Sequence, residues 1–275
     1  MYSRTGDWDV TTLQRDYPRI AARLRSLTSR RCWWEIGAVC ELLKTQPEII
    51  ELKFLGAVMD REWEGERLNG LPAPVPLAPH LTSITIGQVL HEETLTALFR
   101  TSGTASLKNL RLGFETIDDD TPRASISGAL RLVASSLTHL ALRAPSKASP
   151  DAAGLLDEIL PLLAHLEVLE FSEQADGAFQ PVPIATNKVL SVLPSSLRVL
   201  RARNVVSFST SRLLAMLNEP SGIPVLEELE VFWAEDQPGH EVQYRQRHEA
   251  RIEEACRELG IQVAVGRSEV GLAAW

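Results

Sequence analysis

Apolar and polar positions along this chain follow a pattern that returns at nearly constant intervals. Five segments have an L-x-x-L-x-Φ motif, where Φ is an apolar residue, and they begin at residues 107, 137, 166, 197 and 226. Successive segments are therefore 30, 29, 31 and 29 residues apart. The fourth and sixth positions lie two residues apart, so their side chains point to the same face of a β-strand. Weaker versions begin near residues 24, 49, 81 and 260, and the pattern predicts nine strands with one apolar core.

The segments between the expected strands fit helices. We expect helices at residues 33–44, 92–100, 155–163, 186–193, 210–217 and 241–259, and another after Thr121-Pro122. A helix after each strand returns the chain to the same end of the sheet, and parallel pairing requires such a crossover. The expected fold class is therefore α/β, a solenoid with a curved parallel sheet inside and helices outside. A repeat of this length with this leucine motif is typical of leucine-rich repeats. We assign residues 1–19 to a lead-in segment, 20–266 to the solenoid and 267–275 to a C-terminal tail.

Two stretches interrupt this alternation, and one acidic run precedes an expected helix. Residues 60–80 hold two glycines and four prolines, which exclude a regular helix and predict an extended connection. A Pro-rich ligand for another domain is the alternative, although no P-x-x-P there is flanked by a basic residue. Residues 173–185 predict a second loop. The run Asp118 to Asp120 fits either a divalent cation or the N-terminus of the helix that follows Thr121-Pro122, and we favour the helix N-terminus.

Composition narrows the classes of partner and compartment. Hydrophobic residues make up 44 % of the chain, which is enough for a continuous core. The formal net charge of −8 disfavours non-specific attraction to nucleic acid or to an anionic membrane. No apolar run reaches the 18 or more residues of a membrane-spanning helix. Cys32, Cys40 and Cys256 are odd in number and form no C-x-x-C pair, which favours core-facing thiols in a reduced compartment. We expect a monomer in the cytoplasm or nucleus.

Motifs of common catalytic and cofactor sites are missing from the sequence. It contains no G-x-S-x-G, no P-loop, no G-x-G-x-x-G and no H-E-x-x-H, and His91-Glu92-Glu93 lacks the second histidine. The six histidines share no ligand spacing with the cysteines. We therefore expect no enzyme activity, cofactor or metal, with an active site assembled from distant repeats as the alternative.

The residues that flank the core positions of each expected strand point to the inner, concave face of the sheet. Arg111, Arg143 and Arg201 are expected to form one row across the strands, with Glu170 between the last two. One interpretation is a solvated face of mutual salt bridges, which contribute little individually. The other is a strip that binds an acidic protein partner, with aromatic side chains as apolar anchors. The candidate partner-binding residues are Arg111, His139, Arg143, Glu170, Arg201, Arg203, Glu230, Phe232 and Trp233.

The repeated motif resembles the leucine-rich repeats of the ribonuclease-inhibitor-like class over about residues 20–266. More narrowly, residues 18–28, the Trp-containing helix after them and residues 47–52 are similar to the repeat region of fungal F-box-type proteins. That resemblance implies a substrate-receptor role in a ubiquitin ligase. The sequence departs from the pattern of these families in two respects. No repeat has Asn eight residues after its first leucine, and no F-box-like three-helix segment precedes residue 20.

The expected function is recognition of a protein partner through the concave sheet. Two alternatives belong to other classes. One is an enzyme regulator of the GTPase-activating type built on the same scaffold, and the other is a structural scaffold without a partner.

Overall fold

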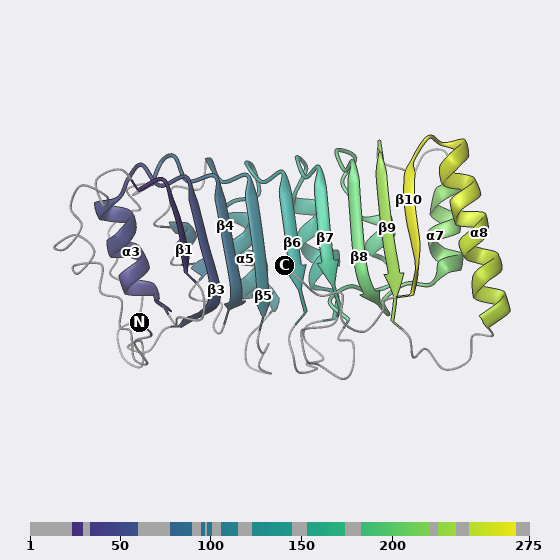
Figure 1. Cartoon of the computed structure of the whole chain (residues 1–275), viewed down its shortest axis with the longest axis horizontal. Helices are drawn as coiled ribbons and strands as arrows, with labels where there is room; N and C mark the ends of the chain where they lie inside the picture. Colours follow the sequence, from purple (N-terminus) through teal and green to yellow (C-terminus); the bar gives the residue numbers. More distant parts are fainter. Residues whose placement is uncertain are drawn as a thin grey trace, which may run out of the picture.

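The computed structural model describes residues 24–29, 34–59, 78–89, 95–96, 98–100, 106–114, 123–144, 153–173, 183–219, 225–234 and 242–267. These residues form one ten-stranded sheet in which every pairing is parallel (Figure 1). Nine strands lie in sequence order, β1-β3-β4-β5-β6-β7-β8-β9-β10, and β2 pairs with β3 off this path. The strands are β1 (Ser26–Ser29), β2 (Trp34–Glu35), β3 (Glu51–Met59), β4 (Ser83–Val89), β5 (Asn109–Phe114), β6 (His139–Arg143), β7 (Val168–Ser172), β8 (Val199–Val205), β9 (Glu228–Trp233) and β10 (Gln262–Arg267).

The repeated leucines form ladders through the core, as the sequence predicts. Leu110, Leu140, Leu169, Leu200 and Leu229 pair in register across β5 to β9, and none is more than 1 % exposed. Each such side chain contributes roughly 1.5–3 kcal/mol by leaving water. The leucines that open the units, at positions 107, 137, 166, 197 and 226, are buried in the same core. The α/β solenoid of in-order parallel strands is therefore confirmed.

Helices follow most strands, and Figure 1 shows α5 behind the strands and α7 beside β10 at the C-terminal end. The described helices are α3 (Ile36–Thr45), α5 (Arg123–Arg131), α6 (Leu155–Ile159), α7 (Thr210–Leu217) and α8 (Val242–Glu258), with 3₁₀ turns η4 (Leu160–Leu162) and η5 (Val189–Ser191). Residues 95–96 and 98–100 are also helical. Their apolar side chains close the core from behind, and Leu98, Leu130, Ile159 and Leu213 are each 1 % exposed or less.

The C-terminal end of the stack is covered by α8, a helix rich in charged residues. It packs against α7 and β10. Ile252 and Cys256 are fully buried, whereas Leu259, which follows the helix, is 51 % exposed. Burial raises the pKa of the Cys256 thiol to about 11, so this cysteine is an unreactive core residue. Cys32 lies outside the described residues.

Two expected elements differ from the structure. Residues 186–193 form no α-helix but only the 3₁₀ turn η5, because the Thr186 hydroxyl accepts a hydrogen bond from the Lys188 amide (3.2 Å) and Pro194 follows closely. The helix expected at residues 33–44 begins at Ile36, since Trp34 and Glu35 instead pair with β3. The acidic run at 118–120 and the Pro-rich residues 60–77 lie outside the described residues.

Consecutive units are also joined by their backbones where each strand begins. The carbonyl of the second residue of one unit accepts hydrogen bonds from two successive amides of the next. Lys108 O, for example, accepts from Thr138 N (3.0 Å) and His139 N (2.9 Å). The carbonyl oxygens of Thr138, Glu167 and Arg198 each accept the same pair of hydrogen bonds from the next unit. This backbone ladder links units that have no asparagine eight residues after their first leucine.

Replacing Leu200 with Asp is expected to unfold the central units together. Leu200 is 1 % exposed, and an unpaired carboxylate at such a position costs about 3–5 kcal/mol. Thermal melting followed by circular dichroism measures the loss. Val225→Asp is the control, because Val225 is 75 % exposed and its melting temperature should not change. Unchanged melting of Leu200→Asp would contradict the register of the leucine ladder.

Candidate functional site

The candidate site is the face of the sheet opposite α5 and α7, which we call the open face. Alternate residues of every strand point to it, and pairing in register places them in rows. The first row contains Asn109, His139, Val168, Val199 and Glu228; the second contains Thr85, Arg111, Ala141, Glu170, Arg201 and Glu230; the third contains Gly113, Arg143, Ser172 and Arg203.

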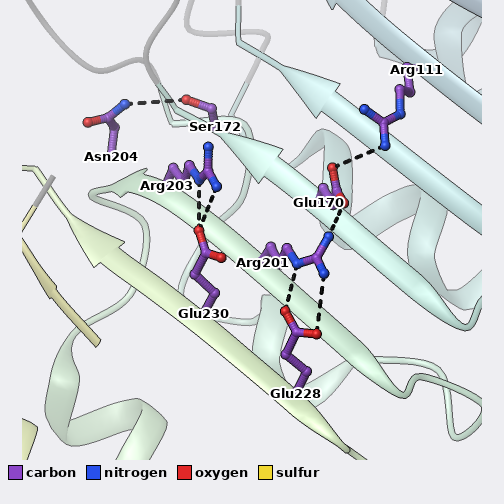
Figure 2. A network of polar contacts seen from close by, with 8 residues as sticks. All are labelled: Arg111, Glu170, Ser172, Arg201, Arg203, Asn204, Glu228 and Glu230. Atoms are coloured by element: carbon purple, nitrogen blue, oxygen red, sulfur yellow. Dashed lines mark hydrogen bonds and ion pairs between the residues drawn. The ribbon is translucent and has the colours of Figure 1, made fainter. Parts of the chain in front are cut away.

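A chain of ion pairs crosses the second row (Figure 2). Arg201 on β8 lies between two carboxylates: its Nη1 is 2.6 Å from Glu170 Oε1, and its Nε is 2.8 Å from Glu228 Oε1. A further bond joins Arg201 Nη2 to Glu228 Oε2 at 3.2 Å, so this pair is bidentate. The hydrogen bonds that Arg201 donates to Glu228 raise the pKa of Arg201 above its ordinary value; partial burial opposes this rise, and the hydrogen bond that Arg201 donates to Glu170 adds to it. Arg201 is therefore held as a charged crosslink between β7, β8 and β9.

Of two further arginines, Arg111 joins this chain and Arg203 forms a separate pair beside it. Arg111 on β5 points over Ala141 toward β7, and its Nη2 lies 3.8 Å from Glu170 Oε2. Arg203 Nε donates to Glu230 Oε1 at 2.8 Å, one row away from its own. Exposed pairs of this kind contribute about 0–1 kcal/mol each, so the network orders the face more than it stabilises the fold.

Arg143 does not lie in the row with Arg111 and Arg201, so that prediction is wrong. It is six residues after the first leucine of its unit, whereas Arg111 and Arg201 are four after theirs, and it pairs with Gly113 and Ser172. Ala141 occupies the second row instead, between Arg111 and Glu170. The Arg143 side chain crosses β5, and its Nη2 donates to the Gly87 carbonyl on β4 (3.1 Å).

Gly113 is the residue that leaves room for this crossing. A Cβ at Gly113 would lie 2.1 Å from the Gly87 carbonyl oxygen and 3.2 Å from Arg143 Nη2. The two strands approach closely there because the β4–β5 register shifts after Ile86.

The two aromatic candidates lie on opposite faces. Phe232 points to the open face, where its ring lies beside Gly266 of β10. Trp233 is 3 % exposed and its Nε1 donates to the Phe208 carbonyl at 3.1 Å, so its expected place on the partner-binding face is wrong. Consecutive strand residues point in opposite directions, and only one of this pair can face outward. His139 is exposed in the first row, with Nδ1 2.9 Å from the Thr138 hydroxyl.

Glu173 is a buried carboxylate that sequence reasoning placed in a loop. It follows β7, is 0 % exposed, and accepts hydrogen bonds at Oε1 from Ile184 N (3.2 Å) and at Oε2 from Val206 N (2.6 Å) and Ser207 N (3.0 Å). Burial raises the pKa of Glu173 above its ordinary value, and the backbone donors oppose that rise. Glu173 therefore joins the connection after β7 to the end of β8.

Within the described ranges, no group of three or more His, Cys, Asp or Glu is arranged to hold a metal ion. Nor does any described helix combine the length and apolarity that crossing a bilayer requires. In comparisons with known proteins, no family model matches this chain and no curated protein shows significant similarity to it.

Replacing Gly113 with Ala is expected to lower the free energy of unfolding by about 1–3 kcal/mol, because its Cβ meets backbone that must shift. Urea unfolding measures the change. The matched control is Gly128→Ala in α5, where nothing lies within 4 Å and the free energy should rise by up to about 1 kcal/mol. Equal behaviour of the two variants would argue against the close approach at Gly113.

Replacing Glu173 with Gln is expected to destabilise the protein by about 1–3 kcal/mol, because the amide nitrogen cannot accept from the backbone donors. The loss should also depend on pH. Since the pKa of Glu173 is raised on folding, the wild-type carboxyl contributes most at acid pH, and its contribution decreases as the pH rises through the folded-state pKa. Urea unfolding of both proteins over a pH series measures this difference.

Glu253→Gln on the exposed side of α8 is the control for Glu173→Gln and should change neither the stability nor its pH dependence. If the stability difference between wild type and Glu173→Gln instead widens as the pH rises, the donors outweigh burial and the direction of the pKa shift is wrong.

Proposed function

We propose that this protein recognises a protein partner through the open face of its sheet. The observation that carries the proposal is that the charged side chains of that face are held in fixed positions. Its charged side chains are aligned in rows and tied to one another across neighbouring strands, as Arg201 is to Glu170 and Glu228. A surface whose side chains are already ordered loses less conformational entropy on binding.

The size and composition of the open face fit a protein partner. Nine strands at about 4.8 Å spacing, with about five residues each, give a surface on the order of 600 Å². A standard protein interface buries about 800 Å² on each side. Several arginines, Phe232, Val168 and Val199 lie on this face, and arginine and aromatic residues are enriched in such interfaces.

A finer form of this proposal is a substrate-receptor role in a ubiquitin ligase, in the cytoplasm or nucleus. It rests on the resemblance of residues 18–52 to the repeats of fungal F-box-type proteins. Capture of a cullin-ligase adaptor together with the partner would support this form.

Adding bulk to the open face is expected to abolish partner binding. In Thr85→Tyr and Val199→Tyr the new rings project from half-buried open-face positions, where strand residues tolerate aromatic side chains. Affinity capture from an extract of the expressing cells, with quantitative mass spectrometry, compares these variants with wild type. The expected result is loss of at least about tenfold of one stoichiometric protein, then reproduced with that protein purified.

Arg131→Tyr is the matched control, because Arg131 is exposed on α5 behind the sheet. Circular dichroism and melting establish that all three variants remain folded. A partner that binds both open-face variants as well as it binds wild type would contradict the proposal.

A further inference from the structure

The C-terminal end of the open face, formed by β9 and β10, carries no basic side chain. The residues of these two strands that point to this face are Glu228, Glu230, Phe232, Gln262, Ala264 and Gly266. The cations that bind the two glutamates come from the neighbouring strand, β8. This end therefore suits a positively charged occupant, and the net charge of −8 attracts such an occupant at long range.

Glu230 has one carboxylate oxygen that the network of ion pairs does not use. Arg203 Nε and Nη2 both lie 2.8 Å from Glu230 Oε1, and Figure 2 shows both contacts ending at that oxygen. By contrast, Arg201 binds both oxygens of Glu228. Glu230 Oε2 makes no hydrogen bond or ion pair within the part of the chain that the structure describes, and it is not sealed from solvent. A donor from outside can therefore bind Oε2 without displacing Arg203.

Phe232 provides an aromatic surface beside this carboxylate. It lies two residues after Glu230 on the same side of β9, and a Cβ at Gly266 would lie 3.6 Å from its Cε1 and 3.7 Å from its Cδ1. The ring therefore packs against a glycine of β10 and stays partly exposed. Ala264, which pairs with Glu230, is exposed and adds only a methyl group. A cation bound at Glu230 can thus also contact the ring, whose face attracts cations within about 6 Å.

The single available oxygen favours a lysine over an arginine. A guanidinium binds a carboxylate best through two parallel hydrogen bonds, one to each oxygen, and Arg203 already occupies Glu230 Oε1. The ammonium group of lysine is a point charge, so one oxygen is enough for it. Its methylene stem can lie along Ala264 and the Phe232 ring, since lysine covers apolar surface with its stem while its charged end stays polar.

We propose that Glu230 and Phe232 bind a lysine side chain of the protein partner, with its ammonium group at Glu230 Oε2 and beside the Phe232 ring. This inference rests on the proposed function and adds the chemistry of the segment that the open face recognises. The Glu230 side chain is only 18 % exposed, so an ion pair formed there is screened less by salt than one between fully exposed charges.

The test selects peptides that bind the folded, full-length protein. A phage-displayed library of random twelve-residue peptides is enriched on wild type, and the best peptide is synthesised with a fluorescent label. Its dissociation constant is then measured by fluorescence anisotropy for wild type, Glu230→Gln, Phe232→Leu, Arg203→Gln, Val199→Tyr and the control Glu253→Gln. Melting curves establish that each variant is folded.

The expected result is a lysine at a fixed position of the enriched peptides. Glu230→Gln should lose about tenfold in affinity, because it keeps the shape of the side chain and removes its charge. Phe232→Leu should lose about two- to fivefold, because it keeps an apolar side chain and removes the ring. Glu253→Gln, on the exposed side of α8, should bind as wild type does.

Arg203→Gln separates recognition of a lysine from a structural role of the ion pair. Glu230→Gln and Arg203→Gln both break this pair, so a purely structural role predicts weaker binding in both variants. If Glu230 binds a lysine, Arg203→Gln should instead bind the peptide more tightly than wild type, because a competing positive charge is removed. Replacing the lysine of the peptide by Gln should weaken binding to wild type but not to Glu230→Gln.

Several outcomes would overturn the inference: peptides without a lysine position, peptides with an acidic residue in its place, equal binding by Glu230→Gln, weaker binding by Arg203→Gln, or no selected peptide. If Val199→Tyr abolishes binding while Glu230→Gln and Phe232→Leu do not change it, the open face remains the recognition surface and only the lysine site fails. If none of the three matters, the proposed function fails as well.

Discussion

The structure depends on in-register parallel pairing between units of nearly equal length. The carbonyl of the second residue in one unit accepts hydrogen bonds from two amides of the next, and this fixes the alignment where each strand begins. Leu140, Leu169 and Leu200 then lie one above another in the core. A slip of one residue would turn every leucine outward and every arginine inward, so backbone and side chains enforce the same register.

The open face is a consequence of that register. Residues far apart in the sequence, such as Arg111 and Glu170, become neighbours because each unit adds one strand at a constant offset. The arginines and glutamates of β7 to β9 therefore form ion pairs across neighbouring strands, and their charges largely balance there.

Much of the fold follows from the sequence because the leucine period is long, regular and specific. The nine strands were predictable, and so were the helices at 210–217 and 241–259. The open-face network was predictable only in part. Counting from the first leucine of each unit places Arg143 two residues further along its strand than Arg111. The row of Arg143 could therefore have been assigned correctly from the sequence. The burial of Trp233 follows from strand alternation with Phe232, whereas its bond to Phe208 is a long-range contact that no local pattern specifies. Glu173 carries no motif, because its donors come from two segments that only the folded stack brings together.

In a stack where each unit touches only its neighbours, stability is a sum of unit terms and interface terms. Glu173 adds to one interface in particular, since it belongs to the unit of β7 yet accepts amides that follow β8. Unravelling that starts at the C-terminal end must release these amides before it passes β8. The Glu173 carboxylate therefore opposes fraying that starts at the C-terminal end. It lies between the units after β8, which can open first, and the central units that carry Arg111.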